Sequence, residues 1–238
     1  MTYRCAAITG ASSGIGRAIA LKMAQENVSV AIFARRIDRL KKLAKEIKAL
    51  NPQVMVFPFQ GDVRDKDSIE RFLSECKANF GELDIFINNA GIAFTKIFTN
   101  LNTDQVQDLV ETNFTGSVWS IYHVMRLFEK RKRGVLVNIS STTVLKPSPT
   151  VPLYAATKLG IAGLVRAMEE KHLENKDIKV INIIPGPTLT ELIPDMVGEV
   201  NNESLISPDD IAHWTWLAIN SPKNCKVSNL VLRNSGKF

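Results

Sequence analysis

The stretch "TGASSGIG", Thr9 to Gly16, follows an apolar run and precedes a helical pattern that begins near Ile15. Its glycines allow a tight turn and let a pyrophosphate approach the backbone, while the free N–H groups of the helix start would point at the anion. The glycine spacing of three residues and then one differs from the G-x-G-x-x-G fingerprint. The stretch therefore predicts a strand–turn–helix unit that holds a phosphate, with a turn without a ligand as the alternative.

Apolar runs alternate with amphipathic segments along nearly the whole chain. The expected strands are residues 5–9, 28–34, 54–59, 84–88, 135–140, 179–184 and 228–232. The expected helices are residues 15–26, 37–50, 66–79, 103–130, 154–175 and 208–220. Strands that are apolar throughout and separated by helices indicate a parallel sheet covered on both faces. We therefore predict an α/β fold, a Rossmann-like doubly wound parallel sheet of about seven strands with helices on both faces.

We expect one domain over residues 1–238, because no repeat, low-complexity tract or linker divides the chain. Two irregular stretches, residues 142–152 and 185–202, each follow an expected strand. Loops beyond the carboxyl ends of parallel strands form the ligand crevice of such a sheet. These two stretches are therefore the expected substrate loops.

Composition excludes several other classes of protein. Hydrophobic residues make up 45% of the chain and charged residues 23%, which is typical of a globular protein, and no apolar run approaches the roughly 20 residues of a membrane span. The apolar run near the N-terminus breaks at Gly10, too early for a signal peptide, so we expect a cytoplasmic protein without membrane contact. The three cysteines are scattered and the three histidines lack metal-ligand spacing, which favours reduced thiols and no metal site.

The formal net charge of +6 does not indicate nucleic-acid binding. Basic residues mostly alternate with acidic ones, and the densest cluster, residues 130–133, ends a helical pattern, where cations are favoured. We expect a small-molecule substrate and no nucleic acid.

Several short motifs carry candidate chemistry. In "YAATK", Tyr154 and Lys158 lie one helical turn apart, so their side chains share a face. "INNAG" (residues 87–91) closes an expected strand, and Asn113 lies inside a helical pattern that it would tolerate poorly or kink. "NISS" places Ser141 at the end of another strand. Taken singly, each motif also fits a helix start, a turn or a cap.

Taken together and in order, these motifs resemble the main single-domain branch of the short-chain dehydrogenase/reductase family. The resemblance runs from Thr9 to about Thr190. The matching residues are Thr9, Gly10, Gly14, Gly16, Asp62, Val63, Asn88, Asn89, Ala90, Gly91, Asn113, Ser141, Tyr154, Lys158, Pro185, Gly186 and Thr188.

The resemblance implies a catalytic role for four residues. Tyr154 would be the general acid/base of hydride transfer between a nicotinamide and a carbonyl or alcohol. Lys158 would hold the nicotinamide ribose, and with the oxidised nicotinamide it would lower the pKa of the phenol. Ser141 would donate to the substrate oxygen, and Asn113 would kink its helix and hold a water in a proton relay.

The end of the second expected strand, "IFARR", indicates the cofactor. A fold that prefers NAD places an acidic residue here for the ribose 2′-hydroxyl, whereas this chain has Ala34 followed by Arg35 and Arg36. Guanidinium groups suit a phosphate, so we expect NADP(H), with solvated helix-start arginines as the alternative. The expected cofactor-binding residues are Gly10, Ser12, Ser13, Gly14, Ile15, Gly16, Arg35, Arg36, Asp62, Val63, Asn89, Ala90, Gly91, Tyr154, Lys158, Pro185, Gly186 and Thr188.

The two substrate loops offer an apolar wall with few polar anchors. The expected substrate-binding residues are Ser141, Val144, Val151, Tyr154, Leu189 and Leu192, with Leu145, Ile193 and Met196 nearby; ordinary loop packing explains the apolar ones equally well. The ending "VSNLVLRNSGKF" resembles reductases of broad activity on 3-hydroxy acids and small ketones. A 3-oxoacyl thioester reductase is the alternative with the same chemistry, and a catalytically silent NADP-binding sensor or scaffold is the alternative of another class.

Assembly follows from the same resemblance. The helix after Tyr154 carries small residues, Ala155, Ala156, Gly160, Ala162 and Gly163, which permit close packing against its own sheet or another chain. The family commonly pairs this helix and the preceding long one across a two-fold axis. We therefore expect a homodimer or homotetramer.

Overall fold

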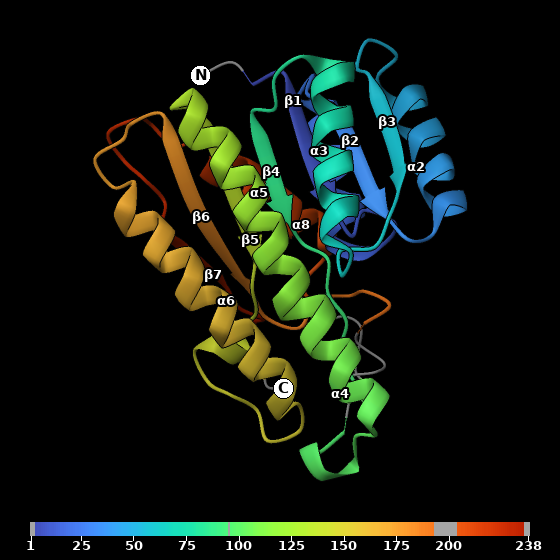
Figure 1. The fold of residues 1–238 in the computed structure, drawn as a ribbon, viewed down its shortest axis with the longest axis vertical. Helices are drawn as coiled ribbons and strands as arrows, with labels where there is room; N and C mark the ends of the chain where they lie inside the picture. The colour runs from blue at the N-terminus through green and yellow to red at the C-terminus, as the bar shows by residue number, and fades with distance from the viewer. Residues whose placement is uncertain (1–2, 95, 193–203, 236–238) are drawn as a thin grey trace.

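A computed structural model describes residues 3–94, 96–192 and 204–235. In this part of the chain seven parallel strands form one sheet in the order β3-β2-β1-β4-β5-β6-β7 (Figure 1). The strands are β1 (Cys5–Thr9), β2 (Ser29–Ala34), β3 (Val56–Gln60), β4 (Ile85–Asn88), β5 (Gly134–Ile139), β6 (Ile178–Pro185) and β7 (Asn229–Leu232). The predicted Rossmann-like doubly wound sheet is confirmed. Its strand order reverses between β1 and β4, so the ligand crevice is expected beyond their carboxyl ends.

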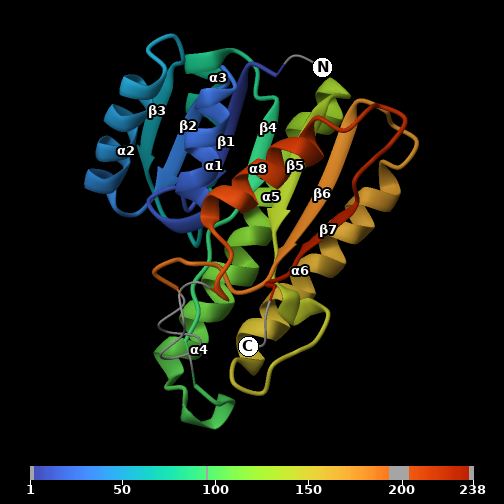
Figure 2. The same cartoon turned by 180° about the vertical axis from the view of Figure 1, so that it is seen from behind.

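Helices cover both faces of the sheet (Figures 1 and 2). On one face lie α1 (Gly14–Gln25), α2 (Ile37–Leu50) and α8 (Pro208–Ile219); on the other lie α3 (Lys66–Phe80), α5 (Gly116–Arg131) and α6 (Pro152–Lys171). Strands β1 to β6 contribute side chains to two cores, one on each face of the sheet. In β1, for example, Ala6 and Ile8 pack towards α1, whereas Cys5 and Ala7 pack towards α3 and α5. This double burial explains why the strands are apolar throughout. Among the described helices none is long and apolar enough to cross a bilayer.

The helix expected over residues 103–130 consists of three joined segments. A regular helix, α4 (Thr103–Leu109), passes into a π-helical turn, η2 (Val110–Thr115), and then into α5. Within this turn Asn113 donates from Nδ2 to the Ile92 carbonyl and accepts at Oδ1 from the Ile92 N–H, both at 2.8 Å. Single π-helical turns of this kind occur inside α-helices, frequently at functional sites. Asn113 therefore interrupts the helix, as one of the two interpretations of its sequence position proposed.

Four asparagines form an amide ladder across β4, β5, β6 and β7. Asn88, Asn138, Asn182 and Asn229 are register partners, and each Nδ2 donates to the next Oδ1 at 2.8, 2.8 and 3.2 Å. A slip of one residue in any of these strands would turn its asparagine to the opposite face of the sheet and leave buried amides without partners. The ladder therefore fixes the register of the strands that carry the crevice.

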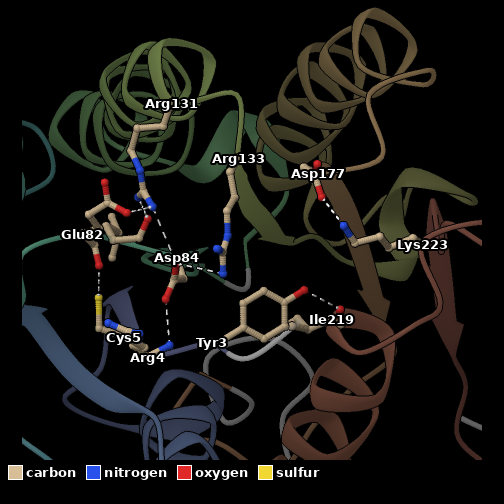
Figure 3. Close-up of polar contacts among 11 residues, drawn as sticks. Tyr3, Arg4, Cys5, Glu82, Asp84, Arg131, Arg133, Asp177, Ile219 and Lys223 are labelled. Carbon is tan, nitrogen blue, oxygen red and sulfur yellow. Dashed lines mark hydrogen bonds and ion pairs between the residues drawn. The ribbon is translucent and has the colours of Figure 1, made fainter.

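The opposite, amino-terminal edge of the sheet is closed by an ion cluster around Asp84 (Figure 3). Asp84 is 5% exposed; its Oδ2 accepts from the Arg4 N–H at 2.7 Å, and its Oδ1 lies 3.7 Å from the guanidinium groups of Arg131 and Arg133. Arg131 also pairs with Glu82 at 2.7 Å, but the Glu82 side chain is 71% exposed. One arginine thus contacts a buried carboxylate and a solvated one.

The two short η helices complete the described elements. They are η1 (Phe98–Asn100), before α4, and η3 (Thr142–Val144), directly after β5. The first turn of η3 begins with Ser141, whose Oγ accepts from the Thr143 N–H at 3.2 Å. This local turn sets the position of Ser141 at the end of β5.

The Asp84 cluster yields a stability prediction. Asp84→Ala should lower the free energy of unfolding by about 3 kcal/mol, because it leaves two arginines and a backbone N–H without their buried acceptor. Glu82→Ala, which removes the solvated partner of the same Arg131, should cost about 0.5 kcal/mol or less. Urea unfolding of the two variants measures the difference, and equal losses would contradict the assigned role of Asp84.

Candidate active site

A cavity of about 610 Å³ opens at the carboxyl ends of the strands. It is lined by the turn after β1 and by the segments that follow β2, β3, β4, β5 and β6. Twenty of the predicted site residues lie on its wall: Gly10, Ser12, Ser13, Gly14, Ile15, Arg35, Arg36, Asp62, Val63, Asn89, Ala90, Gly91, Ser141, Val151, Tyr154, Lys158, Pro185, Gly186, Thr188 and Leu192. The fold thus brings together residues spread over most of the chain.

Four predicted residues lie off this wall. Asn113 is 1% exposed and lies behind Ile92, and Gly16 lies under the turn, where a Cβ would come within 2.5 Å of the Asn89 amide nitrogen. Val144 lies in η3, and Leu189 is 46% exposed, so the cavity does not support either as a substrate contact. Ile193 and Met196, with the rest of residues 193–202 of the second expected substrate loop, lie outside the described residues.

The turn after β1 is shaped for a close approach of its ligand. Gly10 has a φ of +67°, and a Cβ there would lie 2.8 Å from the Ala90 Cα, so only glycine fits. The buried Thr9 hydroxyl accepts from the N–H groups of Asn89 (3.0 Å) and Ala90 (3.2 Å), which joins the ends of β1 and β4. The Ser13 side chain makes no cap bond to α1, so the first N–H groups of this helix keep no side-chain cap and can face an anion.

Tyr154, Ser141 and Lys158 meet at the middle of the cavity. The first turn of α6 carries Tyr154, which is 6% exposed and hydrogen-bonds with the Ser141 side chain. One turn later Lys158 donates from Nζ to the Ile139 carbonyl at 2.9 Å, and its Nζ lies 5.7 Å from the centre of the Tyr154 ring. The strand end and the helix start therefore position a phenol, a hydroxyl and an ammonium around one space.

Burial perturbs both titratable groups of this trio. It raises the pKa of Tyr154 to about 12, with the Ser141 hydrogen bond acting in the opposite direction, and it lowers the pKa of Lys158 to about 8. The expectation that Lys158 lowers the pKa of the phenol is not met by the groups of the protein alone, because desolvation of the buried ring outweighs a neighbouring ammonium. Tyr154 therefore holds its proton at neutral pH, the state required of a proton donor.

Asn113 is positioned by the backbone and does not face the cavity. Besides its two bonds to Ile92, its Nδ2 lies 3.4 Å from the Thr157 hydroxyl, which itself donates to the Tyr154 carbonyl at 2.7 Å. The side chain thus ties the π-turn to the segment after β4 and to the first turns of α6. A relay through Asn113 stays a prediction.

Basic residues line the end of the cavity beside β2. Arg36 donates to the hydroxyls of Ser12 (3.0 Å) and Ser13 (2.9 Å) and pairs with Glu191 at 3.1 Å. Arg35 has no side-chain hydrogen bond or ion pair to any of the described residues and is open to the cavity. The two adjacent arginines of the sequence motif thus differ in their contacts: the guanidinium group of Arg36 is bound by neighbouring side chains, whereas that of Arg35 has no side-chain partner among the described residues.

Asp62 is held by Arg64 at the end of β3. Arg64 donates to Asp62 Oδ2 from Nε (3.0 Å) and Nη2 (2.7 Å), and it pairs with Asp108 at 2.8 Å. Burial alone would raise the pKa of Asp62, but the bonds from Arg64 outweigh it and hold this pKa below its usual value. Asp62 is therefore a fixed, charged acceptor on the cavity wall.

Sequence reasoning missed several polar residues of the site. Glu191 joins Arg36 and Arg39 from more than 150 positions away, so no local pattern indicates it. The wall near Tyr154 also carries polar side chains where an apolar surface was expected: Thr142, Thr143, Lys146, Ser148 and Thr150. The prolines and turn residues around them predict a loop, but they do not predict which side chains of the loop face the cavity.

Comparison with known proteins agrees with this geometry. The model of the short chain dehydrogenase family matches residues 4–200. A 3-oxoacyl-(acyl-carrier-protein) reductase of Staphylococcus aureus is 30% identical over 203 residues, which cover 85% of this chain and 81% of that protein. An uncharacterized oxidoreductase of Staphylococcus epidermidis is 28% identical, with 97% of this chain and 96% of that protein covered.

Solved structures show the same fold over the full length. An alcohol dehydrogenase from the archaeon Thermococcus sibiricus, complexed with 5-hydroxy-NADP, superimposes with a TM-score of 0.88 at 28% identity and 100% coverage of both chains. A metagenomic short-chain oxidoreductase in complex with NADP gives a TM-score of 0.83 at 26% identity, with 98% of both chains covered. With the family model matched over most of its length, the chain belongs to the short-chain dehydrogenase family of oxidoreductases.

Proposed function

We propose that the protein is an NADP(H)-dependent oxidoreductase that transfers a hydride between the nicotinamide and a carbonyl or secondary alcohol. The substrate class is a small ketone or a 3-hydroxy or 3-oxo acid. The observation that carries this proposal is the buried Tyr154, hydrogen-bonded with Ser141 and one helical turn from Lys158, in the same cavity as the glycine turn.

The residues present fit a dinucleotide with a 2′-phosphate. The glycine turn offers a cradle that a Cβ at Gly10 would fill, and the start of α1 offers N–H groups to a pyrophosphate. Arg35 and Arg36, with Ser12 and Ser13, would hold the 2′-phosphate, and the fixed carboxylate of Asp62 would accept from the adenine amine. Further contacts would come from the predicted cofactor residues on the wall: Gly14, Ile15, Val63, Asn89, Ala90, Gly91, Pro185, Gly186 and Thr188.

The catalytic residues divide the proton chemistry among them. A bound nicotinamide supplies or takes the hydride. Tyr154 gives its proton from the phenol oxygen to the substrate oxygen, and Ser141 donates a hydrogen bond to the same oxygen as charge develops. Lys158 would hold the hydroxyls of the nicotinamide ribose, and Asn113 fixes the π-turn. Val151 and Leu192 would contact the substrate, next to Lys146 and Ser148.

Two alternatives remain open to test. The similarity to a 3-oxoacyl-(acyl-carrier-protein) reductase favours a 3-oxoacyl thioester as the substrate. A catalytically silent NADP-binding sensor would bind the cofactor without turnover. A screen of NADPH oxidation over ketones, aldehydes, 3-oxo acids and 3-oxoacyl thioesters distinguishes the three possibilities.

The first prediction of this mechanism concerns Tyr154. Tyr154→Phe keeps the ring but removes the proton donor, so kcat/KM for carbonyl reduction should fall by about 10²- to 10⁴-fold while the Kd for NADPH changes little. Tyr3→Phe is a matched control, because it removes a buried phenol that bonds the Ile219 carbonyl at the other edge of the sheet (Figure 3). Near-normal turnover of Tyr154→Phe would exclude it as the acid.

The second prediction concerns cofactor choice. Arg35 can meet a 2′-phosphate with charge-assisted hydrogen bonds, so the parent should favour NADPH over NADH by about 10- to 100-fold in kcat/KM. Ala34→Asp combined with Arg35→Ile should abolish or reverse this preference. Arg71→Ile controls for loss of an exposed arginine, since Arg71 pairs with Asp65 on α3, away from the cavity. Equal use of both cofactors by the parent would leave Arg35 as a solvated residue.

The third prediction concerns assembly. Apolar side chains stay exposed along η2, α5 and α6, among them Phe114 (38%), Tyr122 (48%) and Leu159 (41%). We propose that this surface packs against a second copy of the chain across a two-fold axis, giving a homodimer or homotetramer. Light scattering at micromolar concentration should give a mass of at least two chains, and Leu159→Glu should lower it. A monomeric parent would exclude the proposal.

A further inference from the structure

The carboxylate of Glu191 lies among the arginines that face the proposed 2′-phosphate site. Its Oε2 is 3.1 Å from Arg36 Nη1, and its Oε1 accepts from Arg39 Nη1. Glu191 and Arg36 both line the cavity, whereas Arg39 lies outside its wall. One acidic side chain from the segment after β6 thus bridges two basic side chains of the β2–α2 region.

The guanidinium group of Arg36 is already engaged on every nitrogen. Its Nε and Nη2 face the Ser12 hydroxyl, Nη2 also donates to Ser13, and Nη1 pairs with Glu191. A phosphate needs the same donors for a two-pronged contact. Because the serines are neutral, Glu191 is the contact that an incoming phosphate would repel. Arg39, followed by Arg36, holds the pKa of Glu191 below its usual value, so the carboxylate is charged at neutral pH.

The position of Glu191 in the chain connects this contact to the catalytic end. Its neighbours Thr190 and Leu192 also line the cavity, and the Leu192 N–H donates to the Thr190 hydroxyl at 3.3 Å. Two residues earlier, the Leu189 N–H bonds the Ile206 carbonyl at 2.9 Å. Beyond this bond, two kinds of side-chain contact hold the described end of the segment. They are the ion pairs of Glu191 and the packing of Leu192 against the buried side chains of Ala93, Leu109, Val151 and Tyr154. Release of Glu191 would therefore remove the polar anchor next to Leu192 and leave this part of the wall held by apolar contacts.

We propose that Glu191 is a specificity-determining residue that competes with the 2′-phosphate of NADP(H) for Arg36. Binding of this phosphate displaces the carboxylate and removes the polar anchor of the cavity wall at residues 190–192, so that the adenosine end of the cofactor acts on the substrate end of the cavity. The inference rests on the proposed use of NADP(H). An NAD(H) molecule, which lacks the phosphate, would leave the Glu191 contacts in place.

The affinity test uses ligands without a nicotinamide. Isothermal titration of 2′,5′-ADP and 5′-AMP isolates the phosphate from every contact at the catalytic end. Glu191→Gln should lower the Kd for 2′,5′-ADP by about 3- to 10-fold, since it removes the competing charge. The same variant should change the Kd for 5′-AMP by less than about 2-fold. Asp177→Asn is the matched control, because it neutralises another exposed carboxylate, paired with Lys223, at the opposite edge of the sheet (Figure 3).

Hydrogen exchange tests the coupling to the cavity wall. In the parent, 2′,5′-ADP but not 5′-AMP should raise deuterium uptake in peptides that cover residues 189–192. In Glu191→Gln the uptake should be high already and should not respond to either ligand. Uptake that stays constant in the parent when 2′,5′-ADP binds would overturn the coupling.

The outcomes separate this inference from the proposed function. If the parent binds 2′,5′-ADP and Glu191→Gln leaves its affinity unchanged, only the competition fails. If Glu191→Gln weakens the binding of 2′,5′-ADP, then Glu191 helps to hold the arginines in place for the phosphate, and the proposed competition is wrong. If the parent binds 2′,5′-ADP no better than 5′-AMP, the proposed cofactor fails and the inference fails with it.

Discussion

The hydroxyl of Thr9 joins the two halves of the sheet where they diverge. Fully buried at the end of β1, it accepts from two backbone N–H groups after β4 and donates to the Ile87 carbonyl at 3.3 Å. β2 and β3 extend from β1 on one side, and β4 and β5 on the other, so the crevice opens above this junction. The glycine turn can approach the segment after β4 only because this hydroxyl satisfies backbone groups that would otherwise be buried without partners. The glycine turn after β1 and the segment after β4, which line the same cavity, are therefore positioned by one contact.

The polar groups of Tyr154, Ser141 and Lys158 can be buried together because neighbours with fixed geometry form hydrogen bonds with them. A buried ammonium is unfavourable, yet Lys158 has the Ile139 carbonyl, whose position is set by β5 and the asparagine ladder. The phenol of Tyr154 has Ser141, which the turn of η3 positions at the end of the same strand. The asparagine ladder, which fixes the register of β5, thus helps to position Ser141 and the Ile139 carbonyl relative to Tyr154 and Lys158 on α6.

Much of the fold and the site follows from short-range patterns in the sequence. Apolar runs placed all seven strands to within about two residues, because strands buried on both faces must be apolar throughout. The cavity residues followed from motifs at strand ends. The asparagine ladder and the pairs of Glu191 with Arg36 and Arg39 were missed, since each depends on register or on contacts across more than 40 positions. The pKa of Tyr154 was expected to fall beside Lys158 and an oxidised nicotinamide. In the protein without the cofactor burial raises this pKa, because sequence spacing reveals the nearby Lys158 but not the extent of burial.

Arginine side chains lie at both edges of the sheet, the amino-terminal and the carboxyl-terminal, but their partners differ. At the amino-terminal edge, Arg131 is paired with a backbone carbonyl and two carboxylates, and it closes the structure around Asp84. At the carboxyl edge, Arg35 has no such partner within the described residues, and Arg36 is paired with one exposed carboxylate, that of Glu191, and with two serine hydroxyls. A guanidinium satisfied by buried neighbours contributes stability, whereas one that is open or exchangeable remains available to a ligand. The arginines at the two edges of this sheet thus differ in the burial of their partners, and this difference is what leaves Arg35 and Arg36 exposed to the cavity.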